Sequence, residues 1–153
     1  MKIAFAPALA LGILLSACGG SSAPVAQPNA FPNTKNLPTI QIKDRVINLS
    51  GKSGYQYAKM TLNVLFADPT GQFMNSKADQ LKKLEDSFNA DNPALSEAFN
   101  DVLVTDVSQK SSQDLGSDQG RETLRQQLIK DFNSRLASGP PVLYIEFVDF
   151  VMQ

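Results

Sequence analysis

The chain has 153 residues, a formal net charge of −1 and 42% hydrophobic residues. This length allows one domain, and the balance of 14 basic and 15 acidic residues gives no electrostatic basis for nucleic-acid binding. The chain contains no histidine, which excludes Ser-His-Asp and Cys-His nucleophiles, histidine bases and histidine metal ligands. The single cysteine excludes an intrachain disulfide and a cysteine zinc cluster.

Residues 1–17 have the pattern of an export signal. Lys2 provides a positive charge, and the apolar run Ile3–Leu14 follows it. This run is shorter than the ~20 apolar residues that a membrane-spanning helix needs. We therefore expect a cleaved signal peptide.

The four residues that end this region resemble the lipobox of bacterial lipoproteins, in which the chain is cut before a cysteine whose thiol is then acylated. They are Leu15, Ser16, Ala17 and Cys18. The sequence thus predicts lipid attachment at Cys18, with several acyl chains such as palmitate, because one chain anchors a protein only marginally. The alternative is an ordinary secreted protein with an incidental cysteine.

Residues 18–38 are predicted to form a flexible linker after the lipidated cysteine. Gly19–Pro38 consists mainly of Gly, Ser, Ala, Asn and Pro, and such a composition cannot bury enough apolar surface to order itself. Phe31 and Leu37 are apolar exceptions that could dock, although a solvated linker is the simpler interpretation. The folded domain is expected at residues 39–153.

Two strands are predicted at the start of this domain. Thr39–Leu49 reads as a strand that is interrupted at Lys43-Asp44-Arg45. Gly51–Gly54 is similar to the end of a phosphate-binding loop, but the earlier glycine is missing and a strand follows, so a hairpin turn is expected. Tyr57–Phe66 alternates apolar and polar residues and predicts a strand with one buried face.

Three helices are predicted next. Ser76 and Asp79 approximate a capping box for the first, Asn92 caps the second before Pro93, and Ser117 caps the third. Their expected buried stripes are Ala78, Leu81, Leu84 and Phe88; Leu95, Ala98, Phe99, Val102 and Leu103; and Leu124, Leu128, Phe132 and Leu136. Residues 109–116 are expected to be a polar loop.

The last segment, Val142–Gln153, predicts a strand that is apolar on both faces and hence interior, beside Tyr57–Phe66. Simple alternation places Glu146 and Asp149 on opposite faces, at rim or kink positions. It places two sets of apolar residues on opposite faces of the strand. One face has Val142, Tyr144, Val148, Phe150 and Met152, and the other has Leu143, Ile145, Phe147 and Val151. The predicted order is β-β-α-α-α-β, an α+β domain with a mixed or antiparallel sheet covered by about three helices.

Short segments of this domain occur in a distinctive order and spacing. They are Val46–Leu49, Tyr57–Leu62, Pro93–Leu95, Ser111–Leu115, Gly120–Leu124, Phe132-Asn133 and Phe147–Gln153. Together they resemble the periplasmic domain of the FliL family, the flagellar basal body-associated proteins. The matched positions include Asn48 and Leu49 after the first strand, Gly120, Asn133, and a final strand that ends in Gln153.

This resemblance implies a stomatin-like (SPFH-type) domain that oligomerises around the flagellar stator and supports motility. It implies a protein without enzymatic activity. From composition and residue spacing, no cofactor, metal, small-molecule substrate or nucleic acid is expected. Partners would be further copies in a ring or arc and stator or basal-body proteins. Helix positions such as Lys83 and Arg125 are expected to be exposed and suitable for crosslinking.

One departure from the family concerns the anchor, because FliL proteins usually carry a transmembrane helix where this chain has a lipobox. Gly19, rather than Asp, follows the cysteine, which favours the outer over the inner membrane by the sorting rule of Gram-negative lipoproteins. Three functions remain open. They are a periplasm-facing accessory lipoprotein of the motor, an envelope lipoprotein scaffold without a flagellar role, and an enzyme or small-ligand binder.

Overall fold

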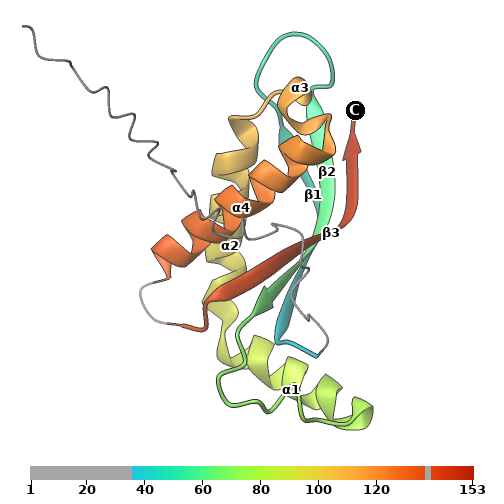
Figure 1. The fold of residues 1–153 in the computed structure, drawn as a ribbon. Coiled ribbons are helices and arrows are strands. Elements are labelled where there is room, and N and C mark those ends of the chain that lie inside the picture. Colours follow the sequence, from blue (N-terminus) through green and yellow to red (C-terminus); the bar gives the residue numbers. More distant parts are fainter. Residues whose placement is uncertain (1–35, 137–138) are drawn as a thin grey trace, which may run out of the picture. The chain divides into compact units, whose positions relative to one another are not determined.

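The computed structural model describes residues 36–136 and 139–153, which contain three strands and four helices (Figure 1). In chain order these are β1 (Thr39–Asn48), β2 (Tyr57–Phe66), α1 (Ala78–Asp91), α2 (Pro93–Ser108), α3 (Ser112–Leu115), α4 (Asp118–Arg135) and β3 (Val142–Met152). The strands form one antiparallel sheet in the order β1-β2-β3. The predicted α+β class is therefore confirmed.

The β1–β2 hairpin follows the sequence-based prediction. Its loop contains Gly51 and Gly54 at φ values of 101° and 83°, a backbone conformation that favours glycine. The register shifts between Ile42 and Arg45, where Asp44 has a φ of 50°. The predicted interruption at Lys43–Arg45 is thus a bulge within a single strand.

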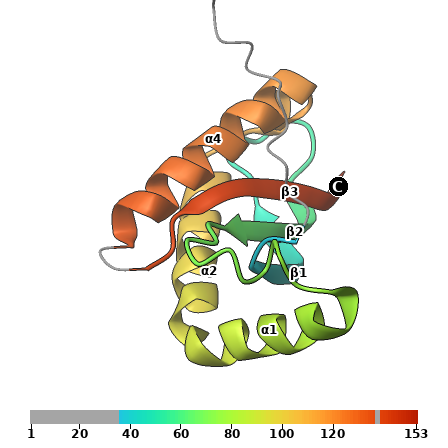
Figure 2. The ribbon, with the colours of Figure 1, turned by 60° about the horizontal axis from the view of Figure 1, so that its bottom comes forward.

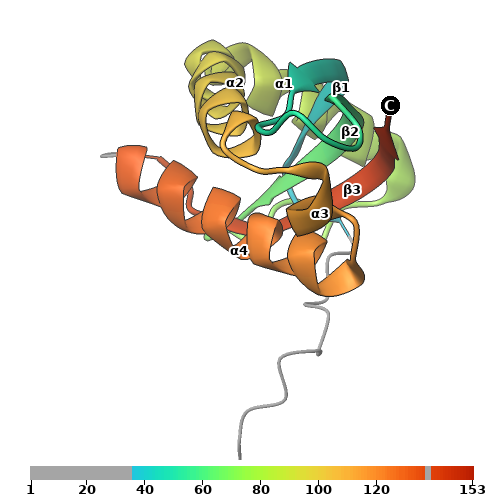
Figure 3. The same cartoon turned by 90° about the horizontal axis from the view of Figure 1, so that it is seen from above.

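The C-terminal strand β3 pairs with β2 as predicted, but the expectation of an interior strand is wrong. The interior strand is β2, and β3 lies at one edge of the sheet. Helices α2 and α4 lie on the same face of the sheet, as seen from above in Figure 3. The apolar residues of β3 therefore do not indicate burial on both faces.

Two register shifts in β3 explain why simple alternation assigned its faces wrongly. They fall at Val148 and Leu143, each an extra residue opposite β2. An extra residue reverses the phase of all side chains beyond it. The residues whose partners on β2 face the core are Val142, Ile145, Phe147, Phe150 and Met152.

The same shifts place Glu146 and Asp149 on one face, not on opposite faces. Glu146 pairs with Asn63, and Asp149 pairs with Thr61. Both partners lie two residues apart on β2, so all four side chains belong to the face opposite the helices.

The hydrophobic core lies between the sheet and the helices α2 and α4, which pack against each other. The predicted stripes of both helices are confirmed. Their fully or almost fully buried members are Leu95, Phe99, Val102 and Leu103 on α2, and Leu124, Leu128 and Phe132 on α4. From the sheet, the core receives Ile40, Ile42, Ile47, Ala58, Met60, Leu62, Val64, Phe66, Val142 and Ile145.

Helix α1 is peripheral, and the prediction of a buried stripe along it is wrong. It has no fully buried residue, and Leu81, Leu84 and Phe88 are only half-buried. Figure 2 shows α1 apart from α4, at the bottom of the view. Only Phe88 reaches the core, where its ring lies 5.4 Å from that of Phe66.

The helix starts differ in part from their predictions. Lys77, and not Ser76, is the N-cap of α1, because Ser76 donates its hydroxyl to the Gln72 carbonyl. Asn92 precedes Pro93 at the start of α2, but its side chain donates back to the Phe88 carbonyl instead of capping. Ser117 does cap α4 by accepting from the Gly120 amide at 3.0 Å.

The expected polar loop at residues 109–116 contains the short helix α3. Ser111 accepts from the Asp114 amide, and the Asp114 carboxylate accepts from the Ser111 amide, which forms a capping box. Leu115 is fully buried. Composition alone favoured a loop because four residues are too few to produce a helical pattern.

Candidate functional site

The most distinctive local arrangement is the seam where α4 lies along the edge strand β3. Arg125 donates its Nε to the carbonyl oxygen of Ile145 at 2.7 Å and pairs with Glu122. Its guanidinium also lies 5.2 Å from the ring centroid of Tyr144 and 5.3 Å from that of Phe147. One side chain therefore holds the strand by a charge-assisted hydrogen bond and by two cation–π contacts.

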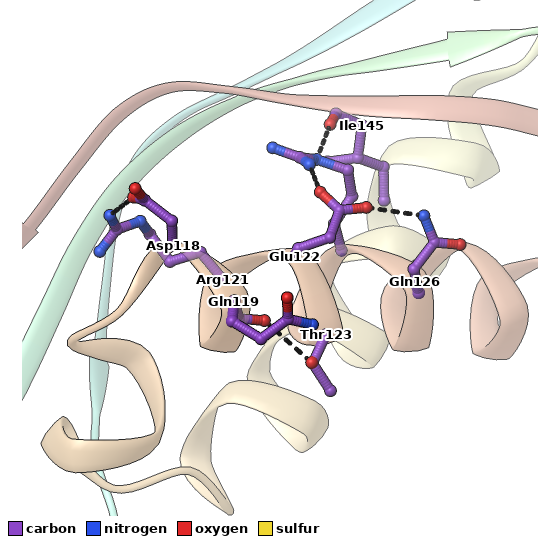
Figure 4. Close-up of polar contacts among 8 residues, drawn as sticks. Asp118, Gln119, Arg121, Glu122, Thr123, Gln126 and Ile145 are labelled. Carbon is purple, nitrogen blue, oxygen red and sulfur yellow. Dashed lines mark hydrogen bonds and ion pairs between the residues drawn. The ribbon is translucent and has the colours of Figure 1, made fainter. Parts of the chain in front are cut away.

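This geometry corrects the expectation that Arg125 is an exposed crosslinking position. Only 16% of its side chain is exposed, since it lies between α4 and β3. Figure 4 shows Glu122 beneath Ile145, with Gln126 donating to the other carboxylate oxygen of Glu122. Lys83 is exposed, as predicted.

Arg121 makes a second set of contacts one helical turn earlier. It donates to the carbonyl oxygen of Leu115 at 3.1 Å, pairs with Asp118 (Figure 4) and lies 5.9 Å from the ring centroid of Phe150. The sequence-based analysis assigned neither arginine a role in holding β3. Their spacing of four residues, next to the buried position Leu124, is a signal that could have indicated a shared face toward β3.

Asn133 completes the seam at the start of β3. Its Nδ2 donates to the carbonyl oxygen of Val142 at 2.9 Å, and its Oδ1 accepts from the Val142 amide at 2.8 Å. The side chain thus satisfies both main-chain groups of an edge residue, as a neighbouring strand would. This gives one family-matched position a structural role.

Gly120 is required by close packing between α3 and α4. A Cβ atom at this position would lie 1.7 Å from the carbonyl oxygen of Asp114, which is far inside any allowed contact. The amide of Gly120 also donates to the capping hydroxyl of Ser117. Any side chain at this position would force the α3–α4 turn to open.

The remaining family-matched positions lie together at the hairpin end of the sheet. Asn48 pairs with Tyr57, and Leu49 is buried and donates its amide to Gln56. The carbonyl oxygen of Gln153 accepts from the amides of Gln56 and Tyr57, and the Gln153 amide donates to Tyr57. The structure therefore brings Asn48, Leu49 and Gln153 together, while Gly120 and Asn133 lie on α4.

The face of the sheet opposite the helices carries a polar ladder across all three strands. Gln41 on β1 donates to Asn63 on β2 at 3.0 Å, and Asn63 donates to Glu146 on β3 at 2.9 Å. Lys59 pairs with Asp44 at 2.8 Å, and this hydrogen-bonded charge lowers the pKa of the Asp44 carboxyl group. The ladder links the three strands on the face opposite α2 and α4.

Exposed apolar side chains gather on this face and along the β3 edge. Val46 on β1 and Val151 on β3 flank Lys59 and are 62% and 41% exposed. The two bulge residues, Leu143 and Val148, are 47% and 52% exposed. Isolated exposed apolar residues are common, but several along one edge strand are typical of a contact surface.

Two pockets among the described residues are large enough to consider as binding sites. One has a volume of about 440 Å³ and lies where the chain enters β1, leaves β2 and enters β3. The other, of about 340 Å³, is lined mainly by residues around α3 and the start of α4, including Lys110, Asp114 and Thr123. The main-chain and hydroxyl hydrogen bonds from Ser111 lower the pKa of Asp114, and they already use its carboxylate for capping.

Asp106 is a buried carboxylate that the sequence-based analysis did not single out. It is only 5% exposed on α2, and its Oδ2 has no hydrogen-bond partner. Burial raises its pKa, and the negative charge of Asp131 on α4 acts in the same direction. Lys110, Gln127 and Arg135 act in the opposite direction.

Two searches of the described residues concern metal binding and membrane crossing. Within residues 36–136 and 139–153 there is no group of three or more metal-ligating side chains. Over the same residues, no helix combines the length and hydropathy needed to cross a bilayer. The predicted lipobox residues Leu15, Ser16, Ala17 and Cys18 lie outside the described residues.

Fold and site together define an α+β domain in which α4 binds the edge strand β3. In the described residues, the face opposite α2 and α4 carries exposed side chains. The sequence matches the family model for flagellar basal body-associated protein FliL over residues 39–153. The chain therefore belongs to the FliL family, which confirms the resemblance. No curated protein matches the sequence.

Family membership assigns an accessory role at the flagellar basal body, and hence an association with the cell envelope. The family is a flagellar accessory family that is not known for enzymatic activity. The seam between α4 and β3 consists of packing, ion pairs, cation–π contacts and hydrogen bonds to the main chain.

Proposed function

We propose that the chain is a lipid-anchored, non-enzymatic accessory protein of the flagellar motor. It is attached through Cys18, faces the periplasm, and acts by contact with further copies of itself and with stator or basal-body proteins. The residues 18–38 serve as the linker to the domain 39–153. The observation that carries the proposal is the row of exposed apolar residues along the edge strand β3.

The two halves of this edge differ. In the first half of β3, the α4 side chains of Arg125 and Asn133 form hydrogen bonds with the main chain of Ile145 and Val142. In the second half, Val148 and Val151 are exposed. An open strand edge with apolar side chains can add a strand from another protein. The second half of β3 is therefore the surface that we assign to contact between copies.

Membrane anchoring would allow even a weak contact between copies at this surface to form. Copies that are confined to one membrane surface reach a high effective concentration, so lateral contacts can populate a ring or arc. The linker would allow the domains to orient toward one another. A monomeric domain in dilute solution is compatible with this proposal.

The test uses cysteine substitutions at Val148 and Val151, introduced one at a time and oxidised in intact cells. Each should give a crosslinked dimer, whereas a cysteine at the exposed position Lys130 on α4 should not. The unsubstituted chain, with Cys18 as its single cysteine, controls for background. Deletion of the gene should impair swimming or swarming. Absence of crosslinks to itself or to any envelope protein at both positions would refute the contact surface.

The second candidate is an envelope lipoprotein scaffold without a flagellar role. It is favoured by the lipobox in place of the usual transmembrane helix and by Gly19, which points to the outer membrane. Crosslinks at Val148 or Val151 together with unchanged motility would support this candidate. Fractionation of the two membranes separates the candidates further, because a stator partner requires the inner membrane.

A further inference from the structure

The larger pocket has apolar and aromatic walls. Its volume of about 440 Å³ falls within the range of roughly 300–1,000 Å³ that is typical of ligand sites. The prolines Pro38, Pro69, Pro140 and Pro141 form much of the lining, and Phe73 and Phe88 add two rings with centroids 6.1 Å apart.

Main-chain hydrogen bonds hold the pocket walls in place. The Phe66 amide donates to the carbonyl oxygen of Pro38, and the Ala67 amide donates to that of Pro141, both at 2.9 Å. These bonds join the segment before β1, the end of β2 and the segment before β3. The pocket therefore lies at a junction of three segments that are hydrogen-bonded to one another.

The one carboxylate in the lining, Asp68, is already used by the fold. It accepts from the amides of Phe73 at 2.8 Å and Met74 at 3.1 Å, and from the hydroxyl of Thr70 at 3.1 Å. Partial desolvation raises its pKa, but the hydrogen bonds from Met74, Thr70 and Phe73 lower it overall. Among the described lining residues, the one charged side chain is thus already hydrogen-bonded, and the apolar walls suit an aromatic ring flanked by prolines.

The chain itself contains such a group immediately before the pocket. Phe31 is followed by Pro32 and preceded by Pro28, and it is the only aromatic residue among residues 19–36. It stands seven residues before Pro38, a distance of at most ~25 Å at about 3.3–3.6 Å per residue. A loop this short costs little entropy to close, and the tether gives the ring a millimolar effective concentration.

We propose that Phe31 occupies the pocket lined by Pro38, Phe73, Phe88, Pro140 and Pro141. If the proposed anchor at Cys18 holds, docking leaves only residues 19–30 as a free tether. Its maximal reach then falls from ~65–70 Å to ~40 Å, at about 3.3–3.6 Å per residue. The docked linker would thus set how far the domain can stand from the membrane.

The test places the photocrosslinking amino acid p-benzoylphenylalanine at position 31 of the full-length protein in cells, with mass-spectrometric mapping of the products. Intramolecular products at residues 67–73, 88 and 139–141 are expected. The same amino acid at position 25, in place of Val25, should not reach these residues. A Gln72→Trp substitution at the exposed pocket rim should abolish the products, because its ring occupies the pocket.

Products with another protein, products with a second copy, or products scattered over the domain would each overturn the proposal. Position 31 precedes the first described strand, which begins at Thr39, so the probe replaces no residue of the described strands and helices. The readout also does not require lipidation. Failure of this inference is therefore distinguishable from failure of the proposed anchor or of the proposed motor role.

Discussion

The side chain of Asn133 forms two hydrogen bonds with the main chain of Val142, one to its carbonyl oxygen and one from its amide. The Asn133→Ala substitution removes both partners where Val142 is buried. We expect the free energy of unfolding to fall by about 2 kcal/mol, since each unsatisfied buried group costs roughly 1–3 kcal/mol. Urea denaturation would measure the change.

The matched control for this prediction is Lys130→Ala on the same helix, at an exposed position. It should change the free energy of unfolding by less than about 0.5 kcal/mol, as is usual for surface substitutions. An Asn133→Ala protein as stable as this control would contradict the structural role of Asn133.

The Gly120→Ala substitution should destabilise the domain although alanine favours helices by about 1 kcal/mol. The new Cβ would meet the Asp114 carbonyl oxygen at 1.7 Å, and overpacking of this kind costs ~1–3 kcal/mol. Gly139→Ala is the control, because among the described residues its Cβ would meet only Leu136, at an ordinary contact distance of 3.9 Å. Thermal unfolding of the two proteins should differ clearly, and equal midpoints would show that the α3–α4 turn relaxes freely.

Removal of the last six residues, 148–153, should unfold the domain. The central strand β2 would lose its partner along Ala58–Thr61, and Gln56 and Tyr57 would lose their bonds to Gln153. Met60, now fully buried, would lose the neighbouring Phe150. A truncated protein with an unchanged cooperative melt would show that this part of β3 is dispensable.

A control for the truncation is Gln153→Ala. Gln153 makes its hydrogen bonds through main-chain atoms, and the residue is exposed. The substitution should therefore leave the melting midpoint unchanged. A large shift would mean that the family-matched glutamine acts through its side chain.

The Asp106→Asn substitution should alter the pH dependence of stability. Because burial raises the pKa of Asp106 above its ordinary value of 3.8, the native state binds its proton more tightly than the unfolded state. Between these two pKa values, Asp106 contributes stability that grows as the pH falls and is lost as the pH rises. The asparagine protein should lack this contribution and should be at least as stable at neutral pH.

The measurement compares free energies of unfolding for the two proteins from neutral pH down to about pH 4. Their difference isolates Asp106, because carboxylates with lowered pKa values such as Asp68 and Asp114 contribute equally to both proteins. A difference that is independent of pH would contradict the prediction.

The Cys18→Ser substitution should abolish lipid attachment. Since the thiol is the proposed acyl acceptor, the variant should accumulate as an uncleaved precursor or as a soluble form without label from radioactive palmitate. Ser16→Ala, which keeps a small residue before the cleavage site, should be labelled normally. Normal labelling of the Cys18→Ser protein would exclude the lipoprotein anchor.

Much of the fold could be predicted from local sequence patterns. The stripes Leu95–Phe99–Val102 and Leu124–Leu128–Phe132, the hairpin before Tyr57 and the α+β order all follow from periodicity and turn chemistry. These features are encoded within a few residues of each other. The segments that indicated the FliL family are also short and contiguous, so the sequence sufficed to recognise them.

The features that define the surfaces depend on contacts between distant segments. The edge position of β3 depends on which strand pairs with β2 on each side, and its phase depends on bulges at Leu143 and Val148 that alternation does not reveal. The role of Asn133 depends on a strand that begins nine residues later. The proline-lined pocket exists only because Pro38, Ala67 and Pro141 converge through main-chain bonds. Local periodicity predicts which face of a helix or strand is buried, because it depends only on neighbouring residues. The residues that pack against this face come from distant segments, so only the tertiary structure determines them.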